Sequence, residues 1–127
     1  MQTEGADSLS KSVKQGKLVT LDTVNTKATS LAMRQVVGEL FTLAMEQPQR
    51  MKFEVVSDME AVDACLQFAD DQRILVEPAC GAALAGVCAG LVEEVVGEGP
   101  VVVIVCGGNL VTLDTMEKWK EEAKLIW

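Results

Sequence analysis

The sequence has no histidine and few basic residues, with 11 lysines and arginines against 19 acidic residues and a formal net charge of −8. Binding to a phosphate backbone needs lysine and arginine clustered on one surface. Here the lysines are scattered through the first half of the chain and gather only near its end. The composition therefore argues against a nucleic-acid partner.

Closely spaced metal ligands are missing as well. The cysteines show no CxxC spacing, and the absence of histidine leaves them no imidazole partners. A structural zinc site needs such ligands close together. With 127 residues, of which 49% are hydrophobic, the chain can form a core without a disulfide framework. We therefore expect reduced, buried thiols, as in a cytosolic protein, at Cys65, Cys80, Cys88 and Cys106.

Long apolar segments are also lacking. The N-terminal stretch MQTEGADSLSKSVK has no apolar region of the kind that a signal peptide needs. The longest run without a charge, Pro78 to Val92, is too short and too rich in glycine to span a bilayer. We therefore expect a soluble, cytoplasmic protein without a membrane partner.

Helical and strand patterns alternate along the chain. This alternation predicts an α/β fold with a mostly parallel sheet. Two strands are clear and a third is possible at the N-terminus, which would make an unusually poor sheet. Residues 1–127 are therefore interpreted as a single incomplete domain. The expected helices span residues 7–14, 34–47, 58–69, 79–92 and 112–126, and the expected strands span residues 1–3, 53–57 and 101–105.

The last expected strand leads into the stretch VVVIVCGGN, residues 101–109. A continuous run of valine and isoleucine is typical of a parallel strand that is covered on both faces. Ligands in open α/β sheets bind at the carboxyl ends of such strands. A thiol and two glycines at that end indicate a binding site, although a strand followed by a glycine turn is also ordinary architecture.

Two motifs in the second half of the chain carry a family resemblance: ILVEPACGAALAGV at residues 74–87 and VVVIVCGGN at residues 101–109. Together with MQTEGA, GKLVTL and ATSLAM upstream, they resemble the C-terminal part of the serine/threonine dehydratases. These are pyridoxal-phosphate enzymes of the tryptophan-synthase β-like fold, or fold type II. The resemblance implies part of a three-layer α/β/α structure, the C-terminal portion of the large catalytic domain.

The resemblance also implies a reaction. The family removes water from L-serine or L-threonine and releases ammonia together with pyruvate or 2-oxobutanoate. The family's S-F-K-x-R-G motif, whose lysine links the cofactor, is missing here. Its S-G-G-N-A-G loop and its Gly-rich phosphate loop are missing too. We therefore expect a fragment or truncated product of such an ammonia-lyase, inactive alone, whose full-length parent is a homodimer acting on a small amino acid.

A second interpretation stays open. A truncated isoform or paralogue without catalytic activity would act as an interaction module. Its incomplete sheet would supply the contact, because open strand edges invite pairing with another chain.

Three residues are expected to contact the cofactor. In the family, the cysteine that matches Cys106 lies against the pyridine nitrogen of pyridoxal phosphate. A largely neutral thiol would leave that nitrogen unprotonated, whereas a carboxylate would hold it protonated. Gly107 and Gly108 would let the backbone approach the ring closely.

The resemblance further implies a monovalent cation such as potassium. Family members hold it with backbone carbonyls and one glutamate. The matching carbonyls here belong to Ala6, Leu31 and Met33, but Gln2 stands where the family has the glutamate. An amide oxygen can coordinate a cation without adding charge, so a cation site and ion-free loops are both open interpretations.

Overall fold

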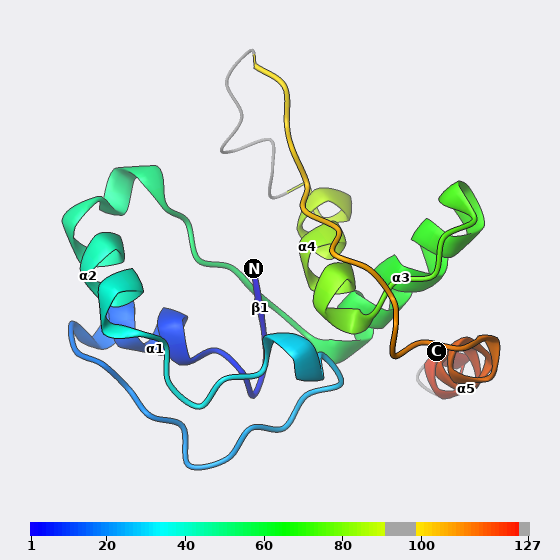
Figure 1. The fold of residues 1–127 in the computed structure, drawn as a ribbon, viewed down its shortest axis with the longest axis horizontal. Helices are drawn as coiled ribbons and strands as arrows, with labels where there is room; N and C mark the ends of the chain where they lie inside the picture. The colour runs from blue at the N-terminus through cyan, green and yellow to red at the C-terminus, as the bar shows by residue number, and fades with distance from the viewer. Residues whose placement is uncertain (91–98, 125–127) are drawn as a thin grey trace.

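The computed structural model describes residues 1–90 and 99–124 (Figure 1). Within these ranges the chain is an α/β structure with a small parallel sheet and several helices, as the alternating patterns predict. No helix in the same ranges is long and apolar enough to cross a membrane. The elements in chain order are β1 (Gln2–Thr3), α1 (Ser8–Gln15), η1 (Thr29–Leu31), α2 (Gly38–Glu46), η2 (Pro48–Arg50), β2 (Val55–Val56), α3 (Asp58–Gln72), α4 (Pro78–Cys88) and α5 (Leu113–Lys124).

The sheet consists of β1 and β2, which pair in parallel. Gln2 lies opposite Val55, and Thr3 lies opposite Val56. The expected strands at the N-terminus and at residues 53–57 are therefore confirmed, although each is only two residues long.

The expected strand at residues 101–105 is wrong. This segment is extended but belongs to no strand, and Val102 and Ile104 are 79% and 67% exposed. In Figure 1 it passes α4 and does not approach the β1–β2 pair. A buried parallel strand needs hydrogen-bonded neighbours and cover on both faces, and the described part of the chain places no strand beside this segment.

α3 begins at a capping box formed by Ser57 and Glu60. The Ser57 hydroxyl accepts a hydrogen bond from the Glu60 N–H at 3.2 Å, and the Glu60 carboxylate accepts one from the Ser57 N–H at 2.7 Å. These bonds satisfy backbone donors that a helix start leaves free. The helix ends at Arg73, whose φ of 59° is left-handed.

α4 begins at Pro78, a residue suited to a first helical position because its missing N–H has no partner there. The helix packs closely against α3 at Gly81. A Cβ at Gly81 would lie only 2.0 Å from the Ala61 carbonyl oxygen. Glycine is therefore required at this crossing.

Two helices are shorter than expected. α2 begins at Gly38 because Val37, before it, has extended backbone angles. α4 ends at Cys88 and is followed by Gly90, whose φ of +70° ends the helical path. Residues 91 and 92 of the expected fourth helix, and residues 125 and 126 of the expected last helix, lie outside the described residues.

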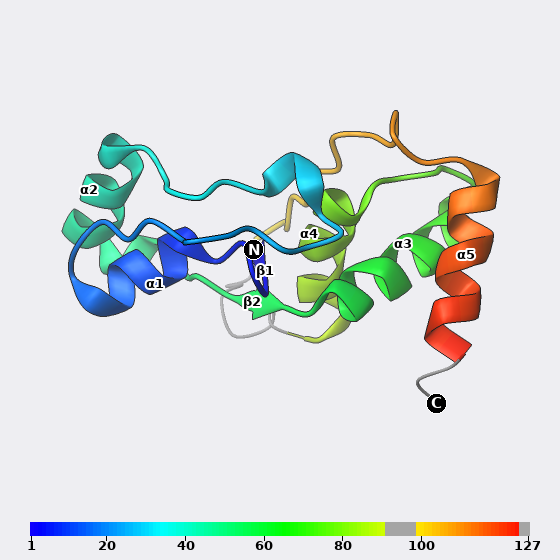
Figure 2. The same ribbon diagram turned by 90° about the horizontal axis from the view of Figure 1, so that it is seen from below.

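The molecule is elongated, with α1 and α2 towards one end, α3, α4 and α5 towards the other, and β1 and β2 between them (Figures 1 and 2). Near β2, a buried cluster joins Val56 to α3 and α4. At one end, α1 and α2 enclose a small cluster of Leu9, Val36 and Ala44. The other end, formed by α3, α4 and α5, holds a larger one. This larger cluster consists of Val62, Cys65, Val76, Cys80, Val111, Met116 and Trp119.

Candidate functional site

The turn that follows residue 105 contains Cys106, Gly107 and Gly108. Gly107 has a φ of +142°, where residues with side chains are strained. Gly108 runs so close to the segment before α4 that a Cβ there would lie 2.2 Å from the Leu75 carbonyl oxygen. The path of the backbone therefore requires both glycines.

Two donors at the start of α4 hold this turn in place. The Glu77 N–H and the Cys80 thiol both donate to the Gly107 carbonyl oxygen, at 3.1 Å and 3.3 Å respectively. The Gly108 carbonyl accepts from the Val111 N–H at 3.0 Å. The two motifs that carry the resemblance thus meet in space. Sequence reasoning assigned Cys80 to the core and missed this bond, because no pattern signals a contact across 27 residues.

The cysteines fall into two classes. Cys65 and Cys80 are buried as expected, but Cys88 and Cys106 are exposed, so the expectation of buried thiols is wrong for these two. Eight residues of α-helix turn the chain about 80° beyond two full turns, which carries Cys88 away from the face that covers Cys80. Burial raises the pKa of Cys65 to about 12, so this thiol stays neutral.

The Cys106 thiol is open to a ligand. It is exposed, and the two residues after it have no side chains. At Gly107 nothing lies within 4 Å of the place where a Cβ would stand. The residues of this turn therefore fit contact with a flat aromatic ring, and the role of each in holding a cofactor stays a prediction.

Gln2 and Ala6, from the set expected around a cation, lie close to the start of α1. The Gln2 Oε1 accepts a hydrogen bond from the Ser10 N–H at 2.8 Å, and its Nε2 donates to the Ala6 carbonyl oxygen at 3.3 Å. An N–H donor thus occupies the carbonyl that would face the cation. This arrangement does not fit an ion at the same place, because the Gln2 amide nitrogen and its proton lie beside the Ala6 carbonyl where the ion would have to lie, and a cation would be repelled by that proton.

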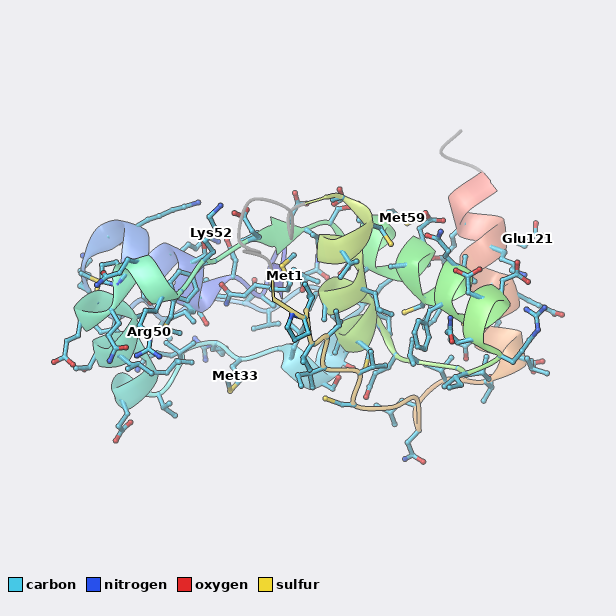
Figure 3. The ribbon with its side chains drawn as sticks, turned by 90° about the horizontal axis from the view of Figure 1, so that it is seen from above. Met1, Met33, Arg50, Lys52, Met59 and Glu121 are labelled. Atoms are coloured by element: carbon cyan, nitrogen blue, oxygen red, sulfur yellow. The ribbon has the colours of Figure 1, made fainter. Side chains whose placement is uncertain are left out.

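Leu31 and Met33 lie in a different segment. Leu31 ends η1 and packs against the α3–α4 core, whereas Met33 is 51% exposed and its side chain points away from the molecule (Figure 3). Within this set, the hydrogen bonds of the described residues join only Gln2 to Ala6. In the same described ranges, no group of three or more cysteine, aspartate or glutamate side chains could hold a metal ion.

Residues 1–107 match the family model for pyridoxal-phosphate dependent enzymes. The chain belongs to this family. The match confirms the expected family and, for the family as a whole, the expected cofactor.

Three proteins are similar to this chain over most of its length. It is 43% identical to the L-serine dehydratase/L-threonine deaminase of Bos taurus, over 96% of this chain and 39% of that protein. It is 35% identical to a putative truncated L-serine dehydratase of Saccharomyces cerevisiae, over 93% of this chain and 58% of that protein. The crystal structure of an L-serine ammonia-lyase from Rhizomucor miehei matches with a TM-score of 0.80 at 30% identity, over 95% of this chain and 39% of that one.

The fold expected from the resemblance, part of the tryptophan-synthase β-like structure, is thereby confirmed. The chain spans about two fifths of the length of the bovine relative and of the fungal structure.

Proposed function

We propose that this chain supplies the C-terminal part of a pyridoxal-phosphate-dependent L-serine/L-threonine ammonia-lyase. The observation that carries the proposal is the turn at Cys106–Gly108, which is anchored to the start of α4 and presents an exposed thiol. The names of the bovine and fungal relatives support serine and threonine as the substrate class. The substrate would lose water between its α and β carbons, and hydrolysis of the product would release ammonia with pyruvate or 2-oxobutanoate.

Cys106 would set the charge on the ring. When bound, the cofactor supplies the electron withdrawal that elimination needs. A thiol is a weak hydrogen-bonding group and, unlike a carboxylate, would not hold a proton on the ring nitrogen, so Cys106 would leave that nitrogen uncharged. Glu77 and Cys80 would keep the turn fixed through the Gly107 carbonyl oxygen.

The role of Cys106 can be tested in a chimera in which residues 1–127 replace the matching part of the bovine relative. We expect Cys106→Ala to weaken cofactor binding and to slow ammonia release about tenfold, the value of one hydrogen bond. Cys106→Ser should be milder, because a hydroxyl can make the same contact. Cys88→Ala, at an exposed thiol outside the turn, is the matched control. Full activity in both Cys106 variants would contradict the proposal.

We also propose that the 127-residue chain alone does not catalyse the reaction. A lysine that links covalently to a carbonyl must be desolvated or lowered in pKa. Each lysine with a described side chain is exposed or half-buried, and Lys27 pairs with Glu122 at 2.6 Å. Purified chain would be mixed with pyridoxal phosphate, reduced with borohydride, and assayed for ammonia release from serine. Release of ammonia together with a stoichiometric adduct at one lysine would overturn the proposal that the chain alone is inactive.

A second candidate function is that of a non-catalytic interaction module. The exposed apolar residues Val102 and Ile104 favour it, because an apolar segment outside the sheet is open to pairing with another chain. Sedimentation of the chain with the bovine relative would test it. Val102→Lys and Ile104→Lys should abolish any complex, and a complex that survives both changes would argue against this segment.

The setting of the parent enzyme is part of the proposal. We propose a homodimer that acts in amino-acid catabolism in the cytoplasm, since free cysteines suit a reducing compartment. Sedimentation of the chimera and fractionation of cells would test these points. The proposal does not extend to a potassium ion beside Ala6, Leu31 and Met33, because the Gln2 amide already holds the Ala6 carbonyl.

A further inference from the structure

The start of α1 is completed by a side chain from β1. Asp7 is the N-cap residue of α1, but its side chain makes no capping hydrogen bond and instead pairs with Lys11 at 2.8 Å. The first N–H groups of a helix need acceptors from elsewhere. Gln2 supplies one, because its Oε1 accepts from the Ser10 N–H at 2.8 Å.

The same Gln2 amide also holds the Ala6 carbonyl. Ala6 and Ser10 are four residues apart, the spacing at which a carbonyl and an N–H would bond directly if α1 began one residue earlier. The amide is inserted between them, accepting from Ser10 and donating to Ala6 at 3.3 Å. These partners fix its orientation, because a flipped amide would place donor against donor and acceptor against acceptor.

We infer that the Gln2 amide replaces a bound monovalent cation, so that this region of the chain is complete without potassium. A glutamate at this position could accept from Ser10, but its second oxygen would face the Ala6 carbonyl oxygen with no proton between them. Two facing oxygens repel each other unless a proton or a cation lies between them, and a carboxylate brings no proton of its own. An amide nitrogen brings its own proton and removes the need for a cation. The inference is independent of the proposed function, since it concerns the folding of this segment.

The test is thermal unfolding of the 127-residue chain in potassium, sodium and choline chloride at one ionic strength. We expect the same Tm for the unchanged chain in all three salts. Gln2→Glu should lower the Tm by roughly 3–5 °C in choline chloride, and potassium should restore it in a saturable manner. If this variant is unfolded in choline chloride, potassium should recover its helical circular dichroism.

Two control variants separate the cation from other effects. Gln2→Met keeps the length of the side chain but removes both hydrogen bonds, so its Tm should fall equally in every salt. Glu4→Gln changes a nearby exposed charge and should not respond selectively to potassium. A saturable rise in Tm with potassium for the unchanged chain would overturn the inference, and so would a Gln2→Glu variant that potassium does not stabilise. Because the readout is unfolding, either result is distinguishable from a failure of the proposed catalytic function.

Discussion

The two ends of the molecule are stabilised by different kinds of contact. Around α3 and α4 the buried side chains are apolar or thiol groups, and Val62 and Cys65 are fully enclosed. Around β1 and α1, buried hydroxyl groups of Thr3, Ser8, Ser10 and Ser12 lie beside the small apolar cluster. Thr3 is fully buried and shares a hydrogen bond with the Thr26 hydroxyl at 2.8 Å. Ser12 is fully buried as well and accepts from the Val19 N–H at 2.9 Å.

The difference shows what each kind of core requires. An apolar core needs matching volumes, whereas a buried hydroxyl must find a specific partner or lose stability. Asp58 joins the two ends, because it begins α3 while its carboxylate accepts from the Thr26 hydroxyl and from the Lys27 N–H, the latter at 2.7 Å. We therefore expect a substitution at the apolar end to change the free energy of unfolding through the volume that it adds or removes. A substitution at the polar end should change it through the single hydrogen bond that it breaks.

The largest effect is expected at the α3–α4 crossing. Gly81→Ala should lower the free energy of unfolding by about 3 kcal/mol, because the new Cβ would collide with the Ala61 carbonyl oxygen. Gly86→Ala in the same helix is the matched control. Its Cβ would meet only the flexible side chain of Met1, at 3.0 Å, and its better helix propensity offsets that contact. Urea unfolding followed by circular dichroism measures both, and equal losses would refute a special role of Gly81.

The next effect is expected where the two ends join. Asp58→Asn should cost about 2 kcal/mol, because hydrogen bonds to a charged acceptor are among the stronger ones and two of them depend on this carboxylate. Asp63→Asn, at an exposed position of the same helix, should leave stability nearly unchanged. Chemical denaturation compares the two, and a loss of similar size in both variants would show that Asp58 is not the link.

The buried Cys65 thiol should make the stability of the apolar end depend on pH. Its pKa is raised by burial from 9.0 to about 12, so above pH 9 the unfolded chain loses this proton while the folded chain keeps it. The contribution of Cys65 to the free energy of unfolding is therefore fully present below pH 9. It falls as pH rises toward 12, by up to about 1.4 kcal/mol per pH unit. Urea unfolding between pH 7.5 and 10.5 would show this fall of stability with pH in Cys88→Ala, the matched control that loses an exposed thiol and keeps Cys65. The slope should be smaller in Cys65→Ala, and an unchanged slope there would contradict the assignment.

The smallest effect is expected from a single bond at the polar end. Thr3→Val keeps the shape of the side chain but removes its hydroxyl, and should cost less than about 1 kcal/mol because Thr26 keeps its bond to Asp58. Thr42→Val, at an exposed position in α2, is the control. A loss as large as that of Gly81→Ala would show that the polar end depends on more than separate bonds.

The helices were largely predictable from the sequence, and so was the family. Asp7 and Gly16 bound α1, and Pro78 starts α4, as local residue preferences predict. Cys106, Gly107 and Gly108 are consecutive in the sequence, and their role as a cofactor site stays a prediction. The hydrogen bond from the Cys80 thiol to the Gly107 carbonyl was not predictable from the sequence, because the two groups meet only after α4 and the turn have packed together.

The sequence alone determined those features whose hydrogen bonds are local. A helix joins residues four apart, so its start and end depend on side chains close by in the chain. The tertiary structure decided the rest. A strand takes its bonds from a neighbour elsewhere in the chain, and residues 101–105, apolar as they are, have no such neighbour in the described structure and remain exposed. The two hydrogen bonds of the Gln2 amide likewise depend on the tertiary structure. Folding places β1 beside α1 and so brings the Ala6 carbonyl and the Ser10 N–H within reach of one side chain.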